Sequence, residues 1–176
     1  ALAAPKNSWG HDVGSVQAVY GMALVWASGK GGGHLMAVTI ENNGRIRTLT
    51  LDRQQALNAF DDEMYKAVGD ALSAAAIDDG VSVVIITGSG RAFCAGTDLG
   101  EMADPKRREK GFVGQFDYFI STVTAFPKPL LAAVNGLGVG IGLTLLPHCD
   151  LVYMSSEARL RAPFVSLGVT VEAGNS

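Results

Sequence analysis

The stretch NGLGVGIGLT, residues 135–144, decides the fold because it joins a buried strand to a helix through closely spaced glycines. The run before it, LLAAV at 130–134, is short and apolar, as expected of a buried strand. Asn135 and Gly136 predict a turn, and residues 138–146 carry a helix pattern. Glycines at such a junction allow positive φ angles and close approach of a ligand to the backbone. The unpaired N–H groups and the dipole of a helix start favour negative charge, so the stretch is a candidate anion site of weak specificity.

A second loop has the same character. FCAGTDL, residues 93–99, comes after the β-branched run VSVVIIT at 81–87, which the glycines of GSG end. Either loop alone is explained most simply by close packing of a helix on a strand. Together, N–H groups from two helix starts could converge on one oxygen as an oxyanion hole, in which losing one donor typically costs about 2.7–4 kcal/mol in the transition state. The glycine spacing at 138, 140 and 142 does not fit a dinucleotide fingerprint, because the required interval and a later ribose-binding acid are missing.

The rest of the chain alternates between strand and helix patterns. Residues 37–41 and 46–51 read as a hairpin around the turn at 42–44. Asp61 or Asp62 can cap a helix through about Ala76. One face of that helix carries an apolar stripe, namely Met64, Val68, Ala71, Leu72 and Ala75. An amphipathic helix is expected near residues 112–124, and short strands at 151–154 and 159–161. This alternation predicts an α/β domain with parallel strands joined by helical crossovers.

Composition excludes several classes of function. Hydrophobic residues make up 48% of the chain and charged residues 18%, with a net charge of −3. The longest basic run, Lys106 to Arg108, reads as a solvated surface, with contact to a ligand phosphate as the sharper alternative. We therefore expect no nucleic-acid partner and no anionic membrane surface. No apolar run reaches the roughly 18 residues of a membrane span.

Cysteine and histidine residues offer little chemistry. Cys94 and Cys149 lie in apolar surroundings without His or Cys at metal-ligand spacing, so we expect reduced packing residues and no metal site. His148 comes after a proline near a predicted helix end, so we expect it to be structural rather than a base.

Residues 1–35 differ in composition from the rest of the chain. The apolar stretch 13–27 lacks the basic segment of a signal peptide, and a glycine-rich stretch stands after it at 29–33. We interpret residues 1–35 as a leader, tag or linker, or as a mistakenly translated upstream segment. The domain is then expected at 36–176, with Met36 as its natural start.

The two glycine loops resemble the signature regions of the crotonase (enoyl-CoA hydratase/isomerase) superfamily. The resemblance runs from about residue 37 to 175 and includes Asp52, Arg53 and the ALNA segment at 56–59, which are similar to the family's opening segment. It implies a crotonase-like spiral of ββα units around an acyl-CoA-binding core. It also implies that a C-terminal helical region is missing, and that the full-length chain forms a homotrimer or a dimer of trimers.

The resemblance also implies the site. Its oxyanion N–H groups map to Thr97 and Ile141, whereas Asp98 is expected to bond backbone donors at a helix start rather than act as the acid. The substrate-binding positions implied for an acyl-CoA or enoyl-CoA thioester are Leu57, Ala59, Ala95, Gly96, Thr97, Asp98, Leu99, Gly140 and Ile141. No cofactor is expected, because coenzyme A is part of the substrate. The compartment implied is the cytoplasm for a bacterial chain, and the peroxisome or mitochondrion for a eukaryotic one.

The carboxylates decide which reaction is expected. Hydratases of this family carry two glutamates, at the positions of Thr144 and Phe164, and both are absent here. Glu172 aligns with the acid/base Glu of the peroxisomal-type Δ3,Δ2-enoyl-CoA isomerases, although the match departs at 169–171, where a proline usually precedes the Glu. One such acid/base residue typically accelerates the reaction by roughly 10²–10⁴-fold. An apolar setting near Phe164 and Leu167 is expected to raise the pKa of Glu172.

The sequence therefore predicts a Δ3,Δ2-enoyl-CoA isomerase of fatty-acid β-oxidation. Two alternatives stay open. One is another crotonase-type activity, such as hydration or thioester hydrolysis. The other is a truncated, non-catalytic acyl-CoA-binding module.

Overall fold

The computed structural model describes residues 34–35, 37–102, 114–171 and 173–174. Residues 32–176 form one compact unit. The segment interpreted as a leader, apart from residues 34–35, lies outside the described residues, as do the basic run at 106–108 and the proposed base Glu172. Among the helices in the described ranges, none is long and apolar enough to cross a membrane.

The described strands lie in two sheets. The larger has the order β1-β2-β3-β4-β6-β8 and the smaller the order β5-β7-β9. Their bounds are β1 His34–Leu35, β2 Val38–Asn43, β3 Ile46–Leu51, β4 Val83–Gly88, β5 Ala92–Cys94, β6 Leu130–Val134, β7 Leu137–Val139, β8 Leu151–Met154 and β9 Arg159–Arg161. The β1–β2 and β2–β3 pairs are antiparallel, and all the others are parallel.

Helices alternate with these strands in a regular order. They are α2 Asp62–Ile77, α3 Leu99–Met102, α5 Gln115–Thr124, α6 Ile141–Thr144 and α7 Phe164–Leu167, with the 3-10 turns η2 Gln54–Ala56 and η3 Leu146–His148. From β2 onward, each pair of strands is followed by a helix: β2-β3-α2, β4-β5-α3 with α5, β6-β7-α6 and β8-β9-α7. The predicted α/β spiral of ββα units is confirmed.

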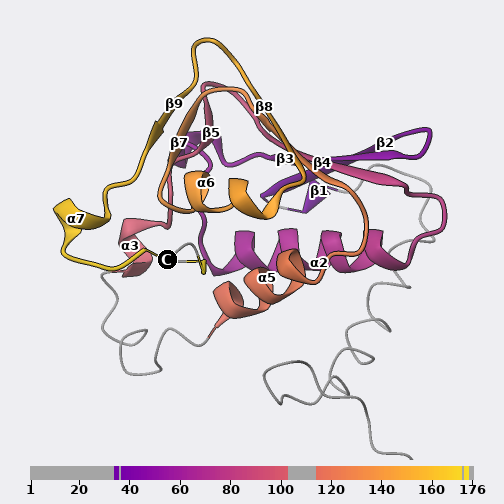
Figure 1. Cartoon of the computed structure of the whole chain (residues 1–176), viewed down its shortest axis with the longest axis horizontal. Coiled ribbons are helices and arrows are strands. Elements are labelled where there is room, and N and C mark those ends of the chain that lie inside the picture. Colours follow the sequence, from indigo (N-terminus) through magenta and orange to yellow (C-terminus); the bar gives the residue numbers. More distant parts are fainter. Residues whose placement is uncertain (1–33, 36, 103–113, 172, 175–176) are drawn as a thin grey trace, which may run out of the picture. The chain divides into compact units, whose positions relative to one another are not determined.

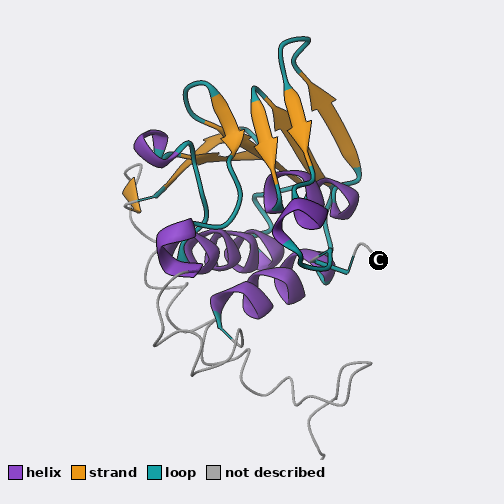
Figure 2. Ribbon diagram, turned by 90° about the vertical axis from the view of Figure 1, so that its left-hand side faces the viewer, coloured by secondary structure: helices purple, strands orange, loops and turns teal. Residues whose placement is uncertain are grey.

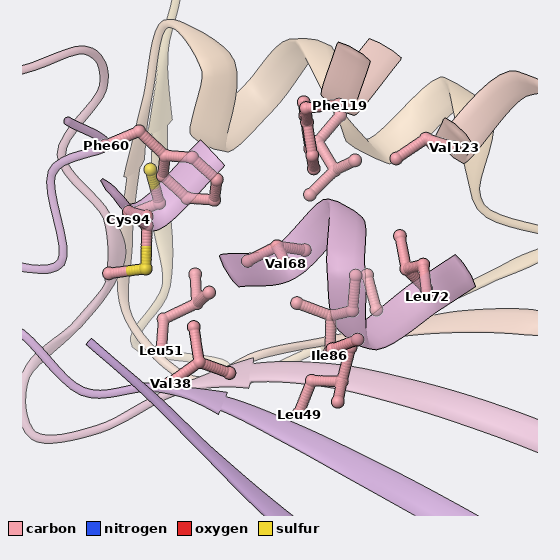
Figure 3. Packing of buried hydrophobic residues seen from close by; sticks show 14 of the residues in the cluster. Val38, Leu49, Leu51, Phe60, Val68, Leu72, Ile86, Cys94, Phe119 and Val123 are labelled. Carbon is pink, nitrogen blue, oxygen red and sulfur yellow. The ribbon is translucent and has the colours of Figure 1, made fainter. Parts of the chain in front are cut away.

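The core lies between the larger sheet and α2. Asp61 caps α2 by accepting a hydrogen bond from the backbone N–H of Met64 at 2.8 Å, as its sequence position predicts. The predicted apolar stripe of this helix is buried. Helix α5 covers the other side of α2 (Figures 1 and 2). In Figure 3, Val68 of α2 lies between strand side chains such as Leu49 and the α5 side chain Phe119.

Three expectations about local structure were wrong. Residues 138 and 139, predicted as the start of a helix, belong to β7, so the helix shrinks to α6 and continues as η3. Residues 92–94, predicted as part of a loop, form β5 and pair with β7. The β-branched run at 81–87 forms a strand that begins only at Val83 and ends at Gly88, and alternate residues in it, namely Val84, Ile86 and Gly88, are buried. Helices cover one face of this sheet, so its opposite face stays partly exposed.

Candidate active site

The two glycine loops lie side by side because β5 and β7 are parallel neighbours. Cys94 pairs with Gly138, so both loops leave the same edge of the smaller sheet. Gly96 has a φ of +105°, which side chains rarely adopt, and a Cβ there would come within 3.2 Å of the Val139 carbonyl oxygen. A Cβ on Gly142 would clash with the carbonyl oxygen of Cys94 and lie 3.0 Å from its Cβ. Glycine is therefore required for the close approach of the two loops.

The backbone of Phe60 fixes the direction of the Thr97 N–H group. Phe60 donates to the carbonyl of Gly96 at 2.8 Å and accepts from the N–H of Asp98 at 2.8 Å. In a trans peptide the N–H points opposite to the C=O of the same unit. Since the Gly96 carbonyl points at Phe60, the N–H of Thr97 points away from it.

The N–H of Ile141 is fixed in the same manner. Its peptide partner, the carbonyl of Gly140, accepts from the N–H groups of Leu143 at 2.8 Å and Thr144 at 2.9 Å. The Ile141 N–H therefore points out of the start of α6, while its side chain is fully buried. Within the described part of the chain, no backbone hydrogen bond uses the N–H of Thr97 or of Ile141. Both N–H groups are therefore candidate donors to a developing oxyanion.

Asp98 holds the first loop in place, which is the structural role expected of it. Its Oδ1 accepts from the backbone N–H of Gly100 at 2.8 Å, at the start of α3. Its Oδ2 forms an ion pair with Nη1 of Arg53 at 2.7 Å, and Nε of Arg53 lies 3.2 Å from Oδ2 of Asp61. Arg53 thus ties the first loop to the cap of α2. Sequence reasoning assigned Arg53 no role, although it lies in the segment that resembles the family.

The segment at 57–59 is fastened to the same loop. Leu57 and Asn58 have positive φ angles of 51° and 59°. Leu57 accepts from the N–H of Ala95 at 3.0 Å, and the side chain of Asn58 donates to the carbonyls of Ser89 at 2.9 Å and Ala92 at 2.8 Å. The predicted substrate-binding positions at 57–59 and 95–99 are therefore brought together, and Leu99 is 71% exposed beside them.

The two positions at which the resemblance implies glutamates in hydratases, Thr144 and Phe164, are both buried. Thr144 is 4% exposed and its hydroxyl donates to the carbonyl of Gly140 at 3.3 Å, while Phe164 is 8% exposed. Leu167, expected to give Glu172 an apolar setting, is 55% exposed. His148 lies in η3, and its Nε2 is 2.7 Å from the carbonyl oxygen of Ala173.

Both cysteines are free thiols, and Cys94 is buried in the core. Burial, with a smaller contribution from the charge of Asp150, raises the pKa of the Cys149 thiol to about 12. Cys94 is buried, and its sulfur accepts from the N–H of Gly96 at 3.4 Å. Among the described residues, no group of three His, Cys, Asp or Glu side chains could hold a metal ion.

Comparison with known proteins gives consistent matches. Residues 41–176 match the family model described as enoyl-CoA hydratase/isomerase. The chain is 37% identical over 141 residues to 2,3-dehydroadipyl-CoA hydratase of Escherichia coli K12, covering 78% of this chain and 53% of that protein. It is 35% identical over 160 residues to enoyl-CoA delta isomerase 2 of Rattus norvegicus, covering 85% of this chain and 40% of that protein.

A solved structure agrees with these matches. The crystal structure of enoyl-CoA hydratase EchA8_6 from Mycobacterium marinum is 51% identical with a TM-score of 0.68, over 74% of this chain and 63% of that one. The chain spans about half the length of the curated relatives it matches, as the first of them illustrates with 53%.

Proposed function

The chain belongs to the enoyl-CoA hydratase/isomerase family, the crotonase superfamily, and we propose that it moves the double bond of a 3-enoyl-CoA to the 2-position. The substrate is then a CoA thioester of fatty-acid metabolism. No separate cofactor takes part, because coenzyme A belongs to the substrate. The expected trimeric assembly and the compartment stay predictions.

The proposed reaction needs one base and an oxyanion hole. Glu172 removes a proton from C2, and the electron pair delocalises into a dienolate whose charge rests on the thioester oxygen. The N–H groups of Thr97 and Ile141 stabilise that oxygen. Glu172 then returns the proton to C4, and the double bond between C2 and C3 remains. Atoms and charge balance without water or any other reactant.

One observation above all supports isomerisation over hydration: the chemistry of the two positions where hydratases carry glutamate. Hydration requires that water be activated and that a proton be delivered at the α-carbon, for which a pair of carboxylates is suited. Here the Thr144 hydroxyl donates to the Gly140 carbonyl and Phe164 is a buried phenyl ring. Neither can accept a proton from water.

The test is conversion of a 3-enoyl-CoA ester to its 2-enoyl isomer by the wild type and by Glu172→Gln. We expect the substitution to abolish turnover and to leave binding of the CoA ester intact. Glu157→Gln, which changes an exposed acid in the turn before β9, is the matched control and should keep wild-type activity. Full turnover in Glu172→Gln would refute the assignment of the base. Tight binding without turnover in the wild type would instead indicate the non-catalytic acyl-CoA-binding module.

Hydration is the second candidate function, since 2,3-dehydroadipyl-CoA hydratase is 37% identical over the matched part. A hydratase would convert a 2-enoyl-CoA and water to the 3-hydroxyacyl ester. We expect the wild type to do this far more slowly than it isomerises a 3-enoyl-CoA. The reverse ratio would favour hydration.

A further inference from the structure

Tyr65 reaches the proposed oxyanion hole from inside the core. Its ring lies in the first turn of α2 and is 1% exposed, yet its hydroxyl is 2.8 Å from Oγ1 of Thr97. We propose that Tyr65 is a positioning residue that fixes the Thr97 N–H group for the thioester oxygen. The inference rests on the proposed oxyanion role of Thr97, but it does not depend on which reaction the site catalyses.

The surroundings of Tyr65 make it a rigid support. The ring packs against Phe60 at 4.8 Å and against Phe116 and Phe119 at 5.5 Å each, measured between ring centroids. Tilted and edge-on contacts of this kind favour one ring orientation. A hydroxyl on such a ring can move little, so a group bonded to it is restrained as well.

The Thr97 peptide needs a support of this kind because the backbone bonds on either side of it both go to Phe60. The Gly96 carbonyl and the Asp98 N–H both bond to the backbone of Phe60, on one side of the segment. Asp98 is also held by Arg53 and by the N–H of Gly100, but these bonds lie beyond Thr97 in the chain. The Thr97 peptide can therefore still pivot about the axis through the two Phe60 bonds, and its N–H would swing with it. The bond from the Thr97 side chain to Tyr65 lies off the axis and opposes the pivot.

The pivot matters because an oxyanion donor must point at the place where charge develops. Small misplacements of catalytic groups cost large factors in rate. For Tyr65→Phe we expect a kcat lower by about five- to tenfold and a KM changed less than about twofold, since a neutral hydrogen bond is lost and the ring stays.

Infrared spectra of a bound, unreactive ester separate positioning from simple packing. The probe is hexanoyl-CoA with carbon-13 at the thioester carbonyl, which has no double bond to move. In the wild type the carbonyl band should shift to lower frequency on binding, because two N–H groups polarise it. In Tyr65→Phe the shift should be smaller or the band broader. Thr97→Val, which keeps the branched shape but removes the hydroxyl, should give the same spectrum, and the double variant should add nothing.

Tyr118→Phe is the matched control. It also removes a phenol hydroxyl from a partly buried site, but that hydroxyl bonds Ser73 and Asp70 rather than a glycine loop. We expect its carbonyl band to equal that of the wild type. The inference would be overturned if Tyr65→Phe left the band and kcat unchanged, or if Tyr118→Phe had an equal effect. It would also be overturned if the wild type showed no binding or no shift. A shifted band in a wild type that does not isomerise would refute the proposed function and leave the inference standing.

Discussion

Replacing Arg53 by Met tests whether the loop that carries Thr97 depends on one guanidinium group. Met keeps an unbranched apolar stem but removes the charge and all the donors. The variant loses the contact to Asp98 at 2.7 Å, the contact to Asp61 at 3.2 Å and the hydrogen bond from Nη1 to the carbonyl of Ala59 at 3.0 Å. Two carboxylates are then left without their shared cation.

The expected loss in the free energy of unfolding depends on how far these groups are buried. Hydrogen bonds to charged groups contribute about 1.5–3 kcal/mol each, and breaking a fully buried ion pair costs about 3–5 kcal/mol. The side chains of Arg53, Asp61 and Asp98 are 23%, 17% and 22% exposed, so solvent screens part of the interaction. We expect the free energy of unfolding to fall by about 2–3 kcal/mol in Arg53→Met after this discount for screening.

Urea unfolding at neutral pH measures this change, with Lys66→Met as the control. Lys66 also pairs with an aspartate, Asp70, but the two side chains are 56% and 34% exposed. An exposed pair within one helix contributes only about 0.3–0.5 kcal/mol. If the two variants differ by less than about 0.5 kcal/mol, the ion pairs of Arg53 do not stabilise the loop. Combining Arg53→Met with Asp98→Asn should give a loss smaller than the sum of the single losses, because the residues interact directly.

Three further predictions concern the packing and ionisation of buried groups. Gly142→Ala should lower the free energy of unfolding by about 1–2 kcal/mol in urea titrations, because the clash with the Cys94 carbonyl exceeds the roughly 1 kcal/mol gain in helix propensity. Asn58→Gly loses the side-chain hydrogen bonds but adopts the positive φ without strain, whereas Asn58→Ala loses the bonds and is strained at that φ. The Tm in thermal denaturation should therefore be lowest for Ala, intermediate for Gly and highest for the wild type. The folded-state pKa of Cys149, about 12, lies above its ordinary value of 9.0, so its contribution to stability is complete below pH 9 and is lost as the pH rises toward 12. Cys149→Ala should therefore flatten the decline of stability in that alkaline range.

The parts of the fold that could be predicted from the sequence are those that local patterns specify. Asp61 stands before an apolar stripe of helical period, and both the cap and the buried face of α2 are found in the structure. The glycine loops come after short apolar runs, and both lie at the ends of parallel strands. In each case the residues that determine the local structure are neighbours in sequence.

The parts that could not be predicted depend on partners far away in the chain. Residues 137–139 carry a glycine-rich pattern compatible with a helix start, but pairing with β5 on one side and β9 on the other makes them a strand. Arg53 lies 45 residues from Asp98, and Asn58 lies 34 residues from Ala92. Such bonds leave no periodic signal, so only the folded chain identifies these residues as supports of the loop.

The reaction is harder to predict than the candidate site because backbone groups form the proposed oxyanion hole. The side chain of Ile141 is fully buried and the Thr97 hydroxyl bonds Tyr65, so both side chains are held inside the protein. Their N–H groups are the proposed donors. Gly96 and Gly140, with φ angles of +105° and +54°, orient the two peptide units. The same backbone arrangement suits any reaction that develops charge on a thioester oxygen. The choice between isomerisation and hydration therefore depends on which carboxylates face the acyl chain, and that choice can change while the glycine loops stay the same.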